Sequence, residues 1–259
     1  MVISLAHFIG STIVSTCNSI GYFVLFLIKA CKTGITTRLK IKKLFAHMND
    51  IGVESINIVV LTGAFTGMVF ALQTYIGFQR VGGEQFLGAV VALGMIRELG
   101  PVLTGLMITG RAGSAIAAEI GTMNITEQLD ALRTLRINTH QYLVVPRILA
   151  SIIIVPCMTI IAMMCGIVGG YITAVHVLQL SPEDYMNSIK GFVELSDVTG
   201  GLVKAAAFGL ILSWVGTYKG FYTHGGARGV GIATTQSVVL SSIMILISNY
   251  FLTKMLEHM

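Results

Sequence analysis

Long apolar blocks, separated by short polar stretches, run through most of this chain. Each clear block can cross the hydrocarbon layer of a bilayer, which needs roughly 20 apolar residues in a helix. Inside a membrane, backbone polar groups must be satisfied within the segment, and apolar blocks of this length do so as helices. The pattern predicts an all-α polytopic membrane helix bundle with five transmembrane helices, at about residues 53–78, 86–120, 142–178, 198–221 and 232–256.

The first 43 residues have a different character and are expected to form a separate N-terminal domain, 1–43, ahead of the membrane bundle 44–259. Residues 2–28 are apolar but carry many hydroxyl and amide side chains. We expect an amphipathic interfacial helix there; a sixth span is the alternative. A basic linker follows, and bases beside a span favour the cytoplasmic side. These bases are Lys29, Lys32, Arg38, Lys40, Lys42 and Lys43.

The remaining polar stretches agree with that orientation. With the basic linker inside, residues 79–84 and 181–197 lie outside, whereas 124–140 and 219–228 lie inside. The outer stretch 181–197 has four acids and one base, and the inner stretches carry several bases. Because Lys and Arg prefer the cytoplasmic side, five spans and a cytoplasmic basic segment are self-consistent.

Composition narrows the function classes. The chain is 54% hydrophobic and 11% charged with a net charge of +5, and its bases cluster beside apolar blocks. The basic excess is therefore typical of membrane topology, not of nucleic-acid binding. The four cysteines form no Cys-x-x-Cys pair and there is no His-Glu-x-x-His motif, so no metal site is expected.

Glycines at short intervals predict close helix contacts. The examples are Gly63-x-x-x-Gly67, Gly166-x-x-Gly169-Gly170 and Gly216-x-x-x-Gly220. Small residues at this spacing let two membrane helices approach at backbone distance.

The second block cannot be an ordinary lipid-facing span. It contains Arg97, Glu98, Arg111 and Glu119, and its longest uncharged run between them, from 99 to 110, has 12 residues. A charge at the bilayer centre costs at least roughly 2.5–3.5 kcal/mol. The segment must therefore be shielded by other helices or line a wet cavity.

Arg97 and Glu98 are the leading candidates for a binding site. They come about a dozen residues into their helix, or ~18 Å from its outer end, and Lys204 in the fourth block can reach the same depth. Adjacent helical positions do not face each other, so Arg97 and Glu98 each need a separate partner or exposure to a cavity. A buried structural ion pair is the alternative. For Arg111 and Glu119, anchoring or pairing between helices is the favoured interpretation.

A short charged segment after the second block, about residues 124–136, predicts a surface helix. Thr126 is a suitable N-cap, and Glu127 and Asp130 place acids in the first turn. Leu129, Leu132 and Leu135 form an apolar stripe that can dock into a groove on a soluble partner. The alternative is a plain solvated connector.

No enzymatic site is predicted. The glycine-rich stretch 225–231 resembles a phosphate loop, but it follows a membrane helix and the chain has no Gly-Lys dipeptide. It therefore lacks a Walker A motif, and we interpret it as a turn between two helices. Ser114 has no persuasive base near it, so we expect no catalytic residue.

Three sequence stretches together resemble the MlaE/YrbE permease family, the membrane subunit of bacterial phospholipid-transporting ABC systems. They are RELGPVLTGLMITGRAGSAIAAEIGTM, EQLDALRTL and GGARGVGIATTQSVV. The similarity covers roughly residues 44–258. It implies a permease subunit without enzymatic activity, in the inner membrane of a Gram-negative bacterium, that moves phospholipids to or from a periplasmic carrier and maintains outer-membrane lipid asymmetry.

The resemblance also implies partners and site residues. The family pattern places a lipid cavity at Arg97, Glu98, Leu99 and Lys204, and an ATPase-coupling helix at Glu127, Leu129, Asp130, Ala131 and Leu132. It implies a homodimer over two cytoplasmic ABC ATPase subunits, which hold the ATP and Mg²⁺, so this chain binds no cofactor. A periplasmic hexamer of MCE-domain protein and a STAS-domain protein are further implied partners. A secondary transporter or ion channel with Arg97 and Glu98 as a relay is the alternative function.

Overall fold

A computed structural model of the chain describes residues 2–36, 41–80 and 82–256. Within these residues every regular element is helical and no strand occurs. Five helical stretches are long and apolar enough to cross a membrane, as predicted, and the protein is a multi-pass membrane protein. These spans cover Ile41–Phe78, Glu84–Ile125, His140–Val177, Leu195–Phe221 and Gly226–Leu256.

Several spans are assembled from shorter helical pieces. The elements in chain order are α1 (Val2–Thr36), α2 (Ile41–Ile51), η1 (Val53–Ser55), α3 (Ile56–Phe78), η2 (Glu84–Phe86), α4 (Leu87–Gly94), η3 (Met95–Leu99), α5 (Gly100–Ile108), η4 (Thr109–Gly113), α6 (Ser114–Ile125), α7 (Gln128–Thr134), η5 (His140–Val144), α8 (Val145–Ile172), η6 (Thr173–Val177), α9 (Pro182–Phe192), α10 (Leu195–Phe221) and α11 (Gly226–Leu256). Span 2 is thus the continuous run from η2 to α6.

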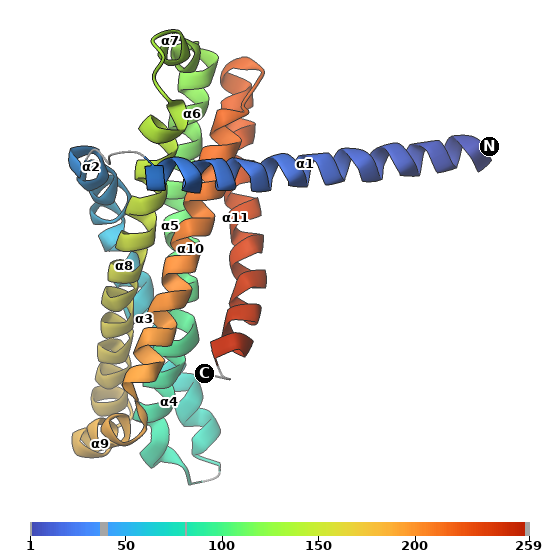
Figure 1. The fold of residues 1–259 in the computed structure, drawn as a ribbon. Helices are drawn as coiled ribbons and strands as arrows, with labels where there is room; N and C mark the ends of the chain where they lie inside the picture. Colours follow the sequence, from blue (N-terminus) through green and yellow to red (C-terminus); the bar gives the residue numbers. More distant parts are fainter. Residues whose placement is uncertain (1, 37–40, 81, 257–259) are drawn as a thin grey trace.

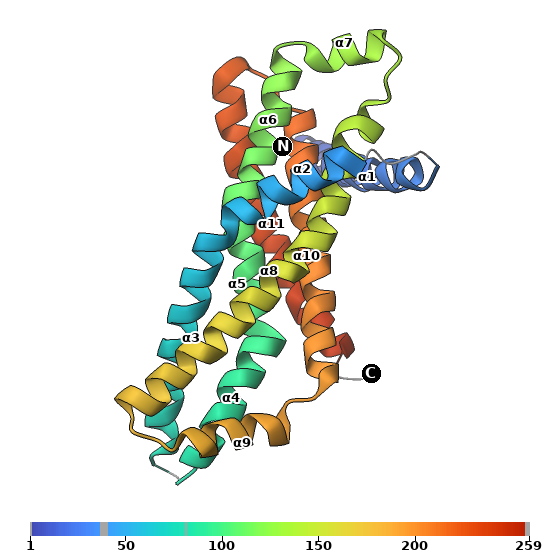
Figure 2. The same ribbon diagram turned by 90° about the vertical axis from the view of Figure 1, so that its left-hand side faces the viewer.

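The long helices run side by side as one bundle with two distinct ends (Figure 1). The short helix α7 lies at one end, together with the turn between α10 and α11. The helix α9 crosses the opposite end (Figure 2). This alternation of ends agrees with the arrangement of polar stretches expected from the sequence.

The helix α1 lies crosswise to the bundle and protrudes from it near the α7 end (Figure 1). It is not one of the five spans. It continues past the expected end at residue 28 and includes Lys29 and Lys32. The linker residues Arg38 and Lys40 lie outside the described residues.

Aromatic contacts fix the second half of α1 across α10. Phe23 stacks on Trp214 with ring centroids 4.0 Å apart, and the Trp214 indole Nε1 donates to the backbone oxygen of Phe23 at 3.1 Å. Phe26 is 3% exposed and packs edge-on against His140 and Phe221. Because buried aromatic pairs stabilise beyond their area, α1 has a defined direction where it leaves the bundle.

Glycines bring α3 and α8 to backbone distance, as the sequence predicted. A Cβ atom on Gly67 would lie 1.9 Å from the carbonyl oxygen of Gly166, and one on Gly63 would lie 2.8 Å from that of Ala162. A Cβ on Gly169 would meet the carbonyl oxygen of Ala64 at 2.4 Å. The small residues therefore form a tight seam between spans 1 and 3.

The outer stretch expected as a polar connection contains the helix α9. Pro182 starts it, Glu183 and Asp184 occupy its first turn, and Tyr185 is buried at 3% exposure. Proline at a helix start and acids near the N-terminus both favour a helix here. The apolar residues of this stretch are interrupted by charged and polar ones, so the sequence analysis described the stretch by its acids and did not predict a helix.

Candidate functional site

Arg97 and Glu98 lie in a π-helical turn, η3, about a third of the way along span 2. Pro101 follows at the start of α5 and has no backbone N–H. The carbonyl oxygen of Arg97, four residues before this proline, therefore lacks its ordinary helical donor. The Nζ atom of Lys204 on α10 lies 2.8 Å from that oxygen and donates to it. The proline thus leaves a backbone carbonyl oxygen without a helical donor, and a lysine from another span donates to that oxygen.

Lys204 and Glu98 form the centre of a buried polar network. The Lys204 side chain is 4% exposed, and its Nζ donates to Glu98 Oε1 at 2.5 Å. Thr253 Oγ1 lies 2.8 Å from both of these atoms, and Asn249 Nδ2 donates to Glu98 Oε2 at 2.8 Å. The network joins span 2, α10 and α11. All three donor positions of the ammonium group have acceptors, because the Arg97 carbonyl is the third.

Arg97 has a separate partner, as adjacent helical positions require. Its Nε and one terminal nitrogen both contact Asp197 Oδ1, at 2.6 and 2.5 Å. Asp197 is 5% exposed in its side chain and also accepts from the backbone N–H of Glu194 through Oδ2. The Arg97 side chain itself is 55% exposed. The carboxylate therefore holds the guanidinium in place while the remaining nitrogen side stays open.

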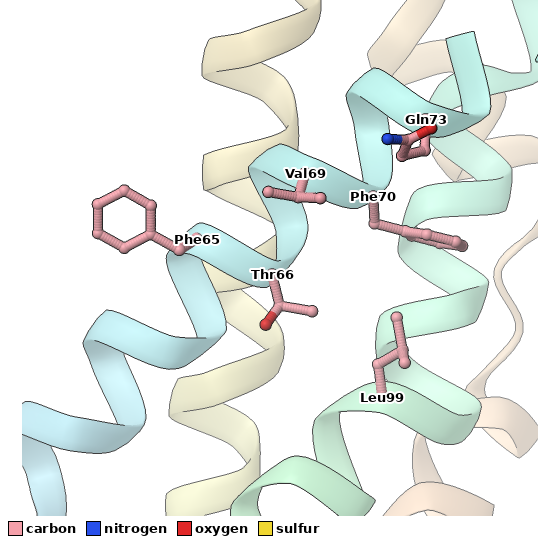
Figure 3. A pocket seen from close by; sticks show the side chains of 6 residues that line it. All are labelled: Phe65, Thr66, Val69, Phe70, Gln73 and Leu99. Carbon is pink, nitrogen blue, oxygen red and sulfur yellow. The ribbon is translucent and has the colours of Figure 1, made fainter. Parts of the chain in front are cut away.

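An apolar hollow of about 460 Å³ lies next to this charged turn. Leu99, two residues after Arg97, forms one wall, and residues of α3 form the other. Figure 3 shows Phe70 and Leu99 pointing towards each other across the hollow, whereas Phe65 points away. The full lining is Phe65, Thr66, Val69, Phe70, Gln73 and Leu99.

The four residues predicted for the site are thus brought close together. Arg97, Glu98 and Lys204 share one network of contacts, and Leu99, in the same turn as Arg97 and Glu98, lines the hollow. An exposed cationic group and an apolar hollow in the same turn of a span have the chemistry to take an amphiphilic anion. Among the described residues no group of three or more His, Cys, Asp or Glu can hold a metal ion.

A second group of charges lies nearer the α7 end. Arg111, in the π-helical turn η4, pairs with Glu54, and Arg147 on α8 pairs with Glu119 Oε1 at 2.6 Å. Arg147 is 2% exposed and also donates to the backbone oxygen of Leu143 at 2.8 Å. These contacts agree with the favoured interpretation that Arg111 and Glu119 pair between helices.

The predicted surface helix is present as α7, but it begins later and is turned differently from the expectation. Its N-cap is Glu127, with a left-handed φ of 60°, whereas Thr126 ends the preceding helix α6. Leu129 is fully buried against the bundle, and Leu132 is half-buried. A helix this short needs an apolar anchor to stay folded, and Leu129 supplies it.

The outward side of α7 is therefore more polar than the predicted stripe. Glu127, Asp130 and Ala131 are exposed, and Leu135 just beyond the helix is 70% exposed. Asp130 pairs with Arg133 at 2.8 Å on this side. Whatever meets α7 from outside the bundle meets these side chains first.

Sequence reasoning missed three members of the site: Asp197, Asn249 and Thr253. Asp197 was grouped with the outer acids, but the Glu194-x-x-Asp197 spacing forms a capping box at the start of α10. Asn249 and Thr253 are four residues apart in the last apolar block, so they share one helix face. Both signals were present in the chain, yet neither names the partner across the bundle.

Comparison with known proteins identifies the family. The sequence profile described as "Permease MlaE" matches residues 44–255. A protein of Rickettsia typhi named "Probable ABC transporter permease protein" is 44% identical over 256 residues, covering 99% of both chains. The "Intermembrane phospholipid transport system permease protein MlaE" of Haemophilus influenzae is 32% identical over 254 residues, covering 98% of this chain and 97% of that one.

A plant protein is similar to most of this chain. The Arabidopsis thaliana protein "TRIGALACTOSYLDIACYLGLYCEROL 1, chloroplastic" is 37% identical over 207 residues, which are 80% of this chain and 59% of that protein. The family profile and these relatives, together with five spans and a charged turn inside span 2, lead to one conclusion. The chain belongs to the MlaE permease family and is the permease subunit of an ABC transporter.

Proposed function

We propose that this permease moves phospholipids between the inner membrane of a Gram-negative bacterium and a periplasmic MCE-type carrier. In that role it maintains the lipid asymmetry of the outer membrane. The observation that carries the proposal is a single turn of span 2 that holds both the exposed Arg97 guanidinium, fixed by Asp197, and Leu99, which lines an apolar hollow. The printed name of the Haemophilus influenzae relative, a phospholipid transport permease, supports it.

The chemistry of the site suits a phospholipid. An arginine forms charge-assisted hydrogen bonds with phosphate oxygens, and its fork can serve two acceptors at once. Arg97 is held at Nε by Asp197 and is more than half exposed, so a headgroup can reach its open side. The acyl chains would lie against Leu99 and Phe70 in the hollow.

Lys204 and Glu98 have a supporting part in this proposal. Both were expected to line the lipid cavity. Since all three donor positions of Lys204 have acceptors, it would have to leave Glu98, Thr253 or the Arg97 carbonyl to reach a lipid. We therefore assign the resting lysine to charge balance of Glu98 and the headgroup contact to Arg97.

The energy for transport would come from a partner ATPase that binds ATP and Mg²⁺. We propose that α7 docks on this ATPase as the coupling helix, with Glu127, Asp130 and Ala131 in contact and Leu129 and Leu132 anchoring the helix to the bundle. Two copies of the permease would stand over two ATPase subunits, each copy with its α7 end in the cytoplasm. ATP binding would close the dimer and empty the lipid site.

The periplasmic side of the proposal concerns α9 and the neighbouring turn η2. This end would face the hexameric MCE-domain carrier, and a STAS-domain protein would associate with the ATPase at the opposite end. The acids of α9, Glu183 and Asp184, are exposed at the proposed carrier-facing end.

The direct test is ATP-driven phospholipid transfer from proteoliposomes that contain the permease with its ATPase and carrier. Arg97→Glu reverses the charge at the proposed headgroup contact and is expected to lower transfer at least tenfold, while the complex still assembles. Arg80→Glu is the matched control, because Arg80 is an exposed arginine at the α9 end outside the site.

Two results would contradict the proposal. Normal transfer by the Arg97→Glu complex would remove the headgroup role from Arg97. Movement of ions through the wild-type chain in the absence of any ATPase, without lipid transfer, would favour the ion-relay alternative instead.

A further inference from the structure

The joint between α2 and α3 is held by a side chain from span 2. The helix α2 ends at Ile51, so its last carbonyl oxygens have no donor within the helix. The terminal nitrogens of Arg111 donate to the Asp50 carbonyl oxygen at 3.0 and 2.8 Å. The same guanidinium donates to Ser55 Oγ at 3.1 Å and pairs with Glu54. One side chain thus caps α2 and contacts the turn η1, which leads into α3.

The cap joins two moving parts of the proposed mechanism. On one side, Arg111 lies in η4, which continues into α6, and α7 follows after the turn at Thr126 and Glu127. On the other side, the joint continues into α3, whose residues Thr66 and Phe70 line the apolar hollow. A change in the position of span 2 therefore acts on the wall of the hollow through this guanidinium.

The surroundings of the joint leave it little freedom of its own. A Cβ atom on Gly52 would lie 2.3 Å from Ile154 of α8, so the joint packs tightly on span 3. The pair Arg147–Glu119 in turn ties α8 to α6. The α6–α7–α8 hairpin can then move as one braced unit, with Arg111 as its polar connection to α2 and α3.

We propose that Arg111 is a positioning residue that transmits movement of α7 to α3 and so to the lipid hollow. This inference rests on the proposed function, because the movement of α7 would come from the partner ATPase. The contacts of Arg111 from which it is argued do not depend on that function. Arginine is suited to the task because its planar fork keeps several hydrogen bonds in a fixed geometry, which a lysine cannot do. The π-helical turn η4, which carries Arg111, can adjust its backbone hydrogen bonding while the guanidinium stays in place.

The test measures amide hydrogen exchange of residues 50–56 in the full permease–ATPase complex, with and without a non-hydrolysable ATP analogue. In wild type, we expect the analogue to change exchange in this joint at least threefold. Arg111→Gln is expected to raise exchange in both states and to abolish the difference between them. Arg111→Lys should fail to restore the response, because the fork is lost.

Glu54→Gln is the matched control at the same joint. It removes one charged partner, whose side chain is 59% exposed, but leaves the bonds from Arg111 to Asp50 and Ser55. It should therefore keep the nucleotide response. A purely structural role for Arg111 predicts equal exchange increases in Arg111→Gln with the nucleotide response intact, and this outcome would overturn the inference.

The exchange measurement is independent of lipid transfer. If wild type shows the nucleotide response in the joint but transfers no phospholipid, the proposed function fails and the transmission stands. If wild type transfers phospholipid without any nucleotide response at residues 50–56, the transmission through Arg111 is wrong and the proposed function stands.

Discussion

Lys204 places a buried positive charge at the centre of the site. It is 4% exposed and neutralises Glu98, whose own side chain is 38% exposed. Removing one member of a buried ion pair typically destabilises a protein by about 3–5 kcal/mol, since the other charge is left uncompensated. Solvent reaches Glu98, so we place the loss for Lys204→Met at the lower end, about 3 kcal/mol. Thermal unfolding of the detergent-purified protein should show a lower Tm.

The double variant Glu98→Gln/Lys204→Met separates charge from packing. Because it removes both charges together, it should recover at least half of the Tm lost by Lys204→Met alone. Losses that simply add in the double variant, or a Lys204→Met protein as stable as wild type, would show that the pair is not an energetic unit.

At the scale of residues, the sequence identified the charged side chains of the site but not the side chains that pair with them. The cost of a charge in a membrane predicted that the charged second block, with Arg97 and Glu98, is shielded by other helices or lines a wet cavity. The rule on adjacent helix positions predicted that Arg97 and Glu98 each have a separate partner or face a cavity. Asp197 and Thr253 complete those pairs. Neither was identified, because which faces of two helices meet depends on tertiary packing, not on the spacing within one helix.

Among the elements, the α3–α8 seam is the most sensitive to added volume. An alanine at Gly67 would place a Cβ atom 1.9 Å from the backbone carbonyl oxygen of Gly166, and backbone cannot move aside as a side chain does. Overpacking of this kind costs typically 1–3 kcal/mol or more. Gly67→Ala should therefore lower the Tm and the yield of folded protein.

Gly77→Ala is the matched control on the same helix. A Cβ atom there would meet nothing within 4 Å, and alanine is favoured over glycine in a helix by up to about 1 kcal/mol. Its Tm should equal or exceed that of wild type. Equal Tm values for Gly67→Ala and wild type would mean that the two helices have room to separate.

The helix α7 is expected to be sensitive on its outward side. Asp130 is exposed and pairs only with Arg133 in its neighbourhood, and an exposed pair contributes at most about 1 kcal/mol. Asp130→Lys should thus fold normally but reverse the charge at the proposed ATPase contact. We expect ATP-driven lipid transfer to fall at least tenfold, measured together with the ATP hydrolysis rate.

The control for that variant is Glu183→Lys, the same charge change on the exposed face of α9 at the other end of the bundle. It should retain coupling of hydrolysis to transfer. If Asp130→Lys also retains coupling, α7 is a solvated connector, which is the alternative that its sequence left open.

Element positions followed from the sequence where the apolar signal was long. All five spans were predicted, and each helix extends beyond its apolar block because polar residues continue the helix into the interface, as at the start of α10 (Leu195). The start of α7 was misplaced at Thr126 because a left-handed Glu127 has no sequence signature. Such a φ is set by the tertiary position of the two flanking helices.

At the scale of the whole molecule, charge and apolar surface divide the protein into regions with different partners. The α7 end carries the basic segment of α2 and the arginine-held joint, whereas the α9 end is acidic. The apolar hollow lies between them on the surface of the single chain. In the proposed dimer, a second copy would cover this hollow.

The most direct measurement of the central claim is photo-crosslinking of labelled phospholipid to a photoreactive residue at Leu99, in membranes containing the complete transporter. The control position is Ile243 on α11, which is 49% exposed and lies outside the hollow. The account predicts a phospholipid adduct at Leu99 whose yield changes severalfold when ATP is supplied, with a constant yield at Ile243. Equal yields at both positions, unaffected by ATP, would contradict it.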